Sequence, residues 1–230
     1  MSRKIYAHAE PVPLATQLLA LPFLSSVYGY LASDTATDLR VTAHRVMTQR
    51  GTTYLQQVCG YANAQGVGPQ RDAGRVFSVD TGILGASYST ANIWRTKFYP
   101  SDDALIGALT SDMKSTNDER KPSEVAWSYL AIPFLTPART VALVFYADCK
   151  TRNFFASDEK INTVVGMCGG YAKLLDALHS VPIPGMRNYD VRHGIELKSD
   201  NSLYPNLHEA LSAVEPPVLK NLKTLNFESK

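Results

Sequence analysis

The sequence predicts an α+β fold, in which a central antiparallel sheet of five or six strands has helices on both faces and is followed by a C-terminal extension. Short segments of alternating apolar residues in the middle of the chain predict the strands. Apolar residues spaced three and four apart predict helices before and after them. With 45% apolar and 19% charged residues, the 230-residue chain can form one core of ordinary size.

The first predicted helix lies within residues 11–33, which contain no charged residue. This stretch is long enough to cross a bilayer, but Pro22, Gly29 and several polar side chains make it weaker than most membrane-spanning helices. A membrane role is therefore the less favoured alternative. We expect the leucines of this helix to cover the sheet or a partner subunit, with Pro22 starting or bending the helix.

The strands begin with residues 39–46 and 54–61, which alternate or nearly alternate around a short polar turn and predict a hairpin. A third strand is expected at 75–79. The insertion 87–122 follows, in which a short helix over 103–109 is expected, capped by Ser101 or Asp102. Residues 114–121 are polar and are predicted to be mobile.

Residues 123–178 contain two further strands, at 127–134 and 140–147, and then a long helix over 158–178. Ser157 suits the N-cap of this helix, and Asp158 and Glu159 complement the positive end of its dipole. Beyond it, we expect a strand at 190–197, a short helix at 207–214, and a short amphipathic helix formed by Val218, Leu219, Leu222, Leu225 and Phe227.

Residues 123–178 resemble the C-terminal half of the GAF domain, a family of small-molecule sensors. That half has a strand that begins near a serine and ends at a proline, a turn, a buried strand, and a Phe with an acidic pair opening the last helix; all occur here in order. Residues 74–85 resemble the GAF segment in which a strand leads through a Gly-x-x-Gly turn into a short helix. The resemblance implies a sensor domain over 14–181 and an extension over 182–230.

The resemblance also implies a stand-alone regulatory protein whose ligand pocket lies between the sheet and the insertion 87–122. Aromatic planes with a few polar groups suit a flat, nucleotide-like heterocycle, although large aromatic side chains also fill ordinary cores. The predicted ligand-binding residues are Tyr88, Asn92, Trp94, Phe98, Tyr99, Arg120, Trp127, Tyr129 and Tyr146.

Specialised GAF chemistry finds little support in the residues present. Phe154-x-x-x-Asp158-Glu159 resembles part of the signature of members that bind cyclic nucleotides, but Cys149-Lys150 stands where that family has Asn-Lys, so we favour a structural role. The absence of cysteine between Cys59 and Cys149 argues against reductase activity and bilin attachment. Haem is disfavoured because no histidine lies between His44 and His179, and we expect both histidines to satisfy local interactions. No cofactor is predicted.

The expected partners follow from charge, cysteine content and the terminal helices. A net charge of +2 without a basic run argues against nucleic acid, and three scattered cysteines predict a reduced, cytoplasmic protein. We expect a homodimer formed through the first and last helices of the domain and a separate protein partner that reads the signal. Two alternatives stay open: an interaction module that binds no ligand, and an enzyme of the same fold using Cys149 or Asp148.

Overall fold

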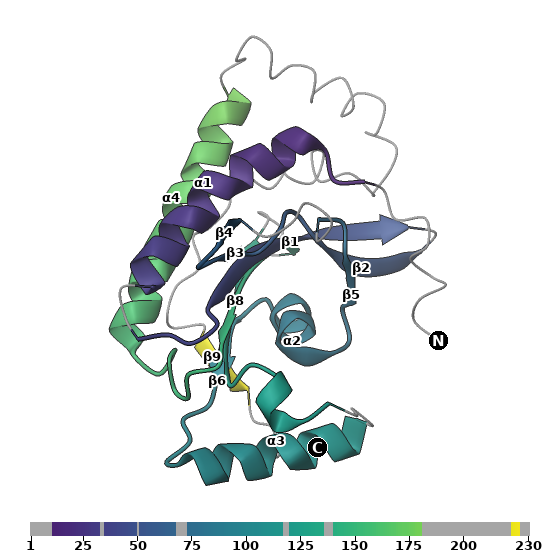
Figure 1. The fold of residues 1–230 in the computed structure, drawn as a ribbon. Coiled ribbons are helices and arrows are strands. Elements are labelled where there is room, and N and C mark those ends of the chain that lie inside the picture. The colour runs from purple at the N-terminus through teal and green to yellow at the C-terminus, as the bar shows by residue number, and fades with distance from the viewer. Residues whose placement is uncertain are drawn as a thin grey trace.

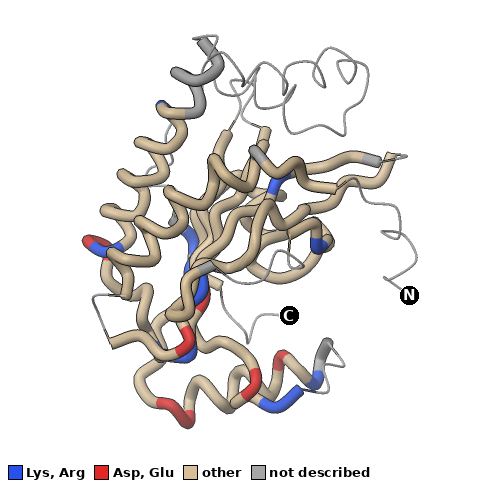
Figure 2. Tube along the Cα trace, turned by 45° about the horizontal axis from the view of Figure 1, so that its top comes forward, with Lys and Arg blue, Asp and Glu red and all other residues tan. Residues whose placement is uncertain are grey.

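The computed structural model describes residues 11–32, 35–49, 51–67, 73–116, 120–135, 140–180 and 222–225. They form one mixed sheet with helices on both faces, which confirms the α+β class (Figure 1). Charged residues are sparse along the first helix and more frequent around the helix at the opposite end of the molecule (Figure 2).

The sheet contains the predicted strands and four more. The strands are β1 (Arg40–Gln49), β2 (Thr52–Gln57), β3 (Ala62–Asn63), β4 (Gly66–Val67), β5 (Val76–Ser78), β6 (Ile93–Thr96), β7 (Ser128–Leu135), β8 (Val141–Cys149) and β9 (Leu222–Leu225). Their order is β4-β3-β1-β8-β7-β6-β9, while β2 pairs with β1 on one side and with β5 on the other. Among the described strands, every pair is antiparallel except β6 with β9.

The predicted hairpin is formed by β1 and β2, with Val46 opposite Leu55. Gly51 lies in the turn between them at φ +79°, a conformation that a side chain rarely adopts. The central pairing of β7 with β8 places Ile132 opposite Phe145, and both side chains are buried. These long central strands form the rigid part of the domain on which the remaining elements are placed.

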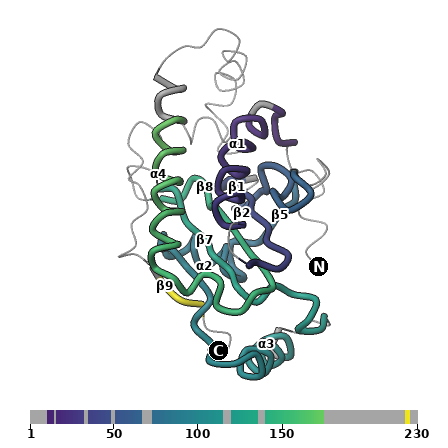
Figure 3. The backbone as a smooth tube through the Cα atoms, turned by 60° about the vertical axis from the view of Figure 1, so that its left-hand side comes forward, coloured from purple at the N-terminus to yellow at the C-terminus, as the bar shows by residue number. Residues whose placement is uncertain are grey.

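Two helices cover one face of the sheet, α1 (Leu14–Leu31) and α4 (Asp158–Ser180), and they lie side by side (Figures 1 and 3). The Phe23 ring of α1 stacks on the Tyr171 ring of α4 with centroids 4.3 Å apart. Leu24 and Val27 of α1 are fully buried, as predicted for a helix that covers the sheet. None of the described helices combines the length and the hydropathy that crossing a membrane requires.

The opposite face is covered by α2 (Gly82–Thr90), which packs on β6, β7 and β8. α2 lies close to the preceding chain, because a Cβ on Gly85 would come within 2.6 Å of the Val79 carbonyl oxygen. Any larger residue at position 85 would push α2 away from its place. We call this side of the sheet the α2 face, and the other side the α1/α4 face.

The insertion forms a longer helix than predicted, α3 (Asp102–Thr116), followed by a short 3-10 turn, η3 (Pro122–Glu124). Ser101 caps α3 as expected, since its Oγ accepts a hydrogen bond from the Ala104 N–H at 3.2 Å. Residues 114–116 belong to this helix, so the predicted polar segment 114–121 begins within α3; residues 117–119 lie outside the described residues. Exposed turns of a helix are also polar, so a polar composition does not distinguish a helix from a mobile loop.

Two further predictions need correction. The strand β6 lies within the insertion, where the sequence analysis placed none, because four residues are too few to show a clear alternation. In the extension, residues 222–225 form β9 and not the predicted amphipathic helix, because pairing with the β6 edge overrides the local spacing of leucines. The strand at 190–197 and the helix at 207–214 lie outside the described residues.

Candidate functional site

The α2 face carries an unusual combination of aromatic and polar side chains for a covered sheet surface. Side chains alternate along a strand, so the residues of β1 that flank Val41 and Ala43 point toward α2. These are Arg40, Thr42 and His44, which lie beside Tyr146 and Asp148 of β8. The α1/α4 face of the same two strands carries Val41, Ala43, Phe145 and Ala147 in its apolar core.

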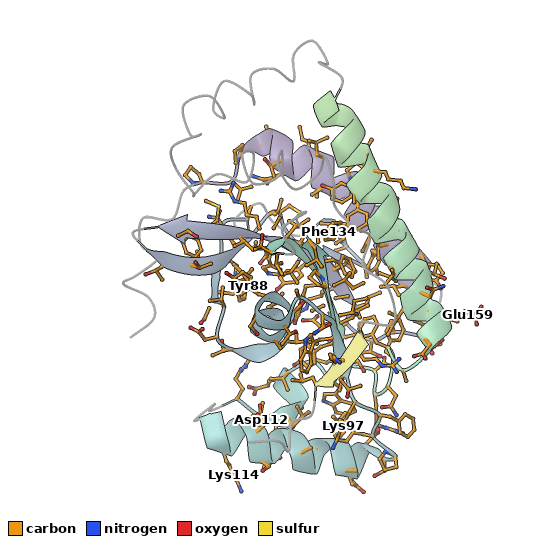
Figure 4. All side chains as sticks on the ribbon, turned by 180° about the vertical axis from the view of Figure 1, so that it is seen from behind. Tyr88, Lys97, Asp112, Lys114, Phe134 and Glu159 are labelled. Carbon is orange, nitrogen blue, oxygen red and sulfur yellow. The ribbon has the colours of Figure 1, made fainter. Side chains whose placement is uncertain are left out.

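Four of the predicted ligand-binding residues come together on this face. Tyr88 from α2, Trp94 from β6, Tyr129 from β7 and Tyr146 from β8 belong to one cluster. The Tyr129 and Tyr146 rings lie 6.5 Å apart, and the Trp94 indole N–H donates to Thr90 Oγ1 at 2.8 Å, which fixes the indole against the end of α2. Figure 4 shows Tyr88 on α2, with Phe134 on the side of the sheet that faces α4. The structure therefore gathers aromatic residues that are far apart in the sequence.

A charged network crosses the strands at one edge of this cluster. Arg40 donates two hydrogen bonds to the Asp148 carboxylate, at 2.8 and 2.7 Å, and Tyr146 donates its hydroxyl to the same carboxylate at 2.7 Å. The Asp148 side chain is 2% exposed and that of Arg40 is 46% exposed, so the network leads from solvent into the protein. The hydrogen bonds to Asp148 raise the pKa of Arg40, while burial and then Asp148 raise the pKa of Tyr146. Both groups therefore keep their protons at neutral pH.

His44 is the most distinctive residue of the α2 face. It is fully buried, and neither ring nitrogen has a hydrogen-bond partner among the described residues. Its ring meets Phe77 and Tyr146 edge-on, with centroids 4.9 and 5.7 Å away. Burial, with a smaller contribution from Arg75, lowers the pKa of His44 to about 3, so the imidazole is neutral and offers one donor and one acceptor. The expectation that His44 satisfies local hydrogen bonds was wrong.

Gln57 lies directly opposite His44 in the β1–β2 register. Its amide nitrogen donates to the Cys59 carbonyl oxygen at 2.8 Å, but its Oε1 is buried without a partner among the described residues. Unsatisfied buried polar atoms are rare and each disfavours the folded state by roughly 1–3 kcal/mol. These two neighbouring residues therefore have hydrogen-bonding capacity that the described residues do not use.

The other predicted site residues lie elsewhere or have different partners. Tyr99 and Trp127 belong to a second cluster, which packs around α3 and η3 with Leu105 and Leu109. Asn92 donates its amide to the Thr90 carbonyl oxygen at the end of α2, and Phe98 is 67% exposed. Consequently, α2 and not α3 covers the cluster with most of the predicted aromatic residues.

Arg120 is exposed, and its charge lowers the pKa of Tyr129, although burial of the phenol outweighs this and raises it overall. Arg75 lies near another edge of the cluster. Its guanidinium is 5.6 Å from the centre of the Phe77 ring, and its charge helps to lower the pKa of His44. Two cations thus lie near the edges of the cluster.

The segment that resembles the cyclic-nucleotide signature lies away from the α2 face. Phe154 packs in the α1/α4 core, Asp158 accepts a hydrogen bond from Arg95 at 2.7 Å, and Glu159 is exposed at the start of α4 (Figure 4). Ser157 caps α4 as predicted, accepting from the Lys160 N–H at 3.2 Å. These contacts give the segment a structural role, as we favoured.

The cysteines are poorly placed for nucleophilic chemistry. Cys59, Cys149 and Cys168 are buried and form no disulfide with one another. Burial raises the pKa of Cys59 and of Cys149 to about 12, so neither thiol ionises near neutral pH. Among the described residues, no three His, Cys, Asp or Glu side chains are grouped as metal ligands would be.

The sequence analysis did not predict Arg40, His44, Gln57 or Asp148 as ligand-binding residues, although it named Asp148 for the alternative of an enzyme. A signal for part of this set is present in the sequence, because polar residues at 40, 42 and 44 alternate with small apolar ones on a single strand. The sequence analysis used that alternation only to predict a hairpin. The neighbouring strands bury His44, whose ring meets Phe77 of β5 and Tyr146 of β8, and this cannot be seen in the pattern of β1 itself.

Comparison with known proteins leaves the family open. No family model matches the chain, and no curated protein matches it. One similar solved structure is an IcIR transcriptional regulator from Alicyclobacillus acidocaldarius, at 17% identity and a TM-score of 0.36. The match covers 68% of this chain and 64% of the regulator, less than two thirds of its length. A likeness this slight assigns neither a family nor a function.

Proposed function

We propose that this chain is a GAF-like regulatory protein that binds a small molecule on the α2 face of its sheet. The observation that carries the proposal is the pair of buried, unsatisfied residues His44 and Gln57 beside Tyr146. A ligand that offers a donor and an acceptor would complete their hydrogen bonds. The GAF-like arrangement is supported by an antiparallel sheet with helices on both faces, together with the motifs at residues 74–85 and 123–178.

The neighbouring residues favour a flat, nucleotide-like ligand. Tyr129, Tyr146 and Trp94 offer aromatic surface, while the neutral His44 and the Gln57 oxygen suit the edge of a heterocyclic ring that carries both a donor and an acceptor. Arg75 and Arg120 supply positive charge at the edges, which favours a ligand with an anionic group. Arg40 contributes less charge because Asp148 already neutralises it.

The ligand would enter on the side of β5. Phe77 of β5 lies against the His44 ring and is only partly buried, whereas β7 and β8 close the site from the centre of the sheet. Displacement of the Phe77 side chain would uncover the imidazole without disturbing the central strands.

The proposal can be tested with a panel of nucleosides, nucleotides and cyclic nucleotides, using thermal shift followed by calorimetry. We expect one member to stabilise the wild type and to bind His44→Leu at least tenfold more weakly. His44→Gln, which keeps a donor and an acceptor, should retain part of the affinity. Lys150→Ala, which removes only the surface pair with Asp38 at 3.2 Å, serves as the control and should bind normally. Equal binding to wild type and His44→Leu would contradict the proposed site.

We further propose that the protein acts as a homodimer formed through α1 and α4 and signals through a separate protein. Leu14 and Leu18 of α1 are 59% and 58% exposed on a helix without a charged residue. On α4, Gly166 and Gly170 face open space, which permits close approach of another helix. Light scattering at micromolar concentration should give a dimer, and the double change Leu14→Glu with Leu18→Glu should give a monomer with an unchanged circular dichroism spectrum.

A second candidate function is an interaction module without a ligand, which the exposed leucines of α1 also favour. It predicts the same dimer but no binding from the nucleotide panel. In that case, His44→Leu would raise the melting temperature and leave dimerisation and partner capture unchanged.

A further inference from the structure

We propose that the outer edge of β6 is a strand-docking site, which β9 occupies within the same chain and which an extended segment of the protein partner occupies in its place. This inference deepens the signalling part of the proposed function, because it names the surface and the kind of partner. It rests on the geometry of β6 and β9. The experiment that tests it does not require a bound ligand.

β9 is held at the end of the sheet by a short parallel pairing. It pairs with β6 in parallel, with Trp94 opposite Lys223 and Thr96 opposite Leu225, and the Lys97 N–H donates to the Leu225 carbonyl oxygen at 2.9 Å. A four-residue parallel pairing is among the weaker forms of strand association. Lys223 and Thr224 are exposed, so these two positions contribute backbone hydrogen bonds and little apolar burial.

β9 covers an edge of the sheet with which an extended partner segment could pair. Residues 181–221 separate β9 from the end of α4, so this strand joins the sheet after a long stretch of chain. Without β9, the backbone donors and acceptors of β6 would form an exposed edge, and such edges bind extended segments readily. The occupant of the edge is therefore exchangeable without loss of the other strand pairs.

β6 also connects the edge to the rest of the protein. On the α2 face, the Trp94 indole bonds to Thr90 of α2 at 2.8 Å. On the other face, Arg95 donates to the Ala156 carbonyl oxygen at 2.8 Å and to Asp158 at 2.7 Å, where α4 begins. A displacement of β6 would therefore affect α2 and the start of α4.

Leu225 provides the link between the edge and the candidate ligand site. Its side chain packs on the same cluster as Trp94 and Tyr129. A ligand on the α2 face would compete with or reinforce this packing, and so alter how firmly β9 is held. The partner segment should be extended and should carry an aliphatic side chain where Leu225 lies, whereas the positions of Lys223 and Thr224 tolerate many residues because they are exposed.

The test uses the full chain and a fluorescent peptide of residues 218–230. Leu225→Asp should release β9 by placing a charge in the apolar cluster, while Lys223→Ala, at an exposed position of the same strand, is the matched control. We expect the peptide to bind Leu225→Asp at least tenfold more tightly than wild type or Lys223→Ala. Amide hydrogen exchange of residues 93–97 should be faster in Leu225→Asp and slow again when the peptide is added.

Wild-type hydrogen exchange provides a second test if Leu225→Asp fails to fold. In mild denaturant, residues 93–97 and 222–225 should lose protection together, before the central strands β7 and β8 do. The proposal would be overturned if residues 93–97 and 222–225 lost protection only in global unfolding. Equal peptide binding by wild type, Leu225→Asp and Lys223→Ala would also overturn it. A wild-type dimer that Leu225→Asp dissociates would overturn it in favour of a second copy of this chain. Nucleotide binding together with equal peptide binding by wild type, Leu225→Asp and Lys223→Ala would refute this inference alone, whereas tighter peptide binding by Leu225→Asp in a protein that binds no ligand would refute only the sensor function.

Discussion

The two faces of the central strands differ in composition and in how completely their polar atoms are satisfied. Where β1 and β8 face α1 and α4, they carry Val41, Ala43 and Phe145, and this surface is part of a large apolar core. On the α2 face, the alternate positions of the same strands carry Arg40, His44 and Asp148. The first arrangement stabilises the fold. The second includes unsatisfied groups that lower stability, which is typical of a surface kept for binding.

The largest expected effect is on the α1/α4 face. Phe145 is fully buried, and its ring meets Phe23 of α1 edge-on at 6.0 Å. Phe145→Ala should lower the free energy of unfolding by about 3–5 kcal/mol, because the lost contacts leave a cavity. Chemical denaturation followed by circular dichroism measures this change. A loss below about 1 kcal/mol would show that this face is not the main source of stability.

The next effect concerns the charged network of the α2 face. Arg40→Ala leaves the buried Asp148 carboxylate with Tyr146 as its remaining side-chain donor among the described residues, and should lower the free energy of unfolding by about 3 kcal/mol. Lys150→Ala removes an exposed pair of the same charge type and should change it by less than about 1 kcal/mol. Denaturation measures both changes in the free energy of unfolding. Similar changes in the two variants would indicate that hydration at the half-exposed position of Arg40 offsets the loss of its hydrogen bonds to Asp148.

Substitution of His44 should change the free energy of unfolding in the opposite direction. His44→Leu replaces two unsatisfied ring nitrogens by apolar atoms and should raise the free energy of unfolding by about 1–2 kcal/mol while removing ligand binding. The same denaturation experiment measures the stability, and the nucleotide panel measures the binding. Destabilisation by His44→Leu would reveal that the imidazole has a structural partner, and the comparison between the faces would lose its main support.

Measured per pH unit, the smallest effect is the pH dependence contributed by His44. Burial lowers its pKa from about 6.5 to about 3, so between these values the unfolded chain binds a proton that the folded chain does not. Wild-type stability should therefore decrease as the pH falls from about 6.5 toward 3, with a contribution of at most about 1.4 kcal/mol per pH unit. His44→Leu removes this contribution. Parallel pH profiles of wild type and variant, in denaturation at constant salt, would contradict a neutral buried imidazole.

The sequence was sufficient for the elements whose signal is local. Alternation or a run of apolar residues predicted β1 and β7, and the spacing of apolar residues predicted α1 and α4, because each of these elements has a regular apolar pattern of its own. β6 and β9 were missed because short edge strands depend on their neighbours for pairing and have little pattern of their own. Of the site, the aromatic residues Tyr129 and Tyr146 were identified by type. His44 and Asp148 could not be paired with them from the sequence, since strand order decides which residues become neighbours.

The most direct measurement is native mass spectrometry of the freshly purified full chain, with His44→Leu and Lys150→Ala purified in parallel. If the α2 face binds a small molecule, wild type and Lys150→Ala should carry the same additional mass on a dimer, and His44→Leu should lack it. An additional mass that persists in His44→Leu, or unliganded wild type that stays unliganded after incubation with the nucleotide panel, would contradict a ligand site at His44.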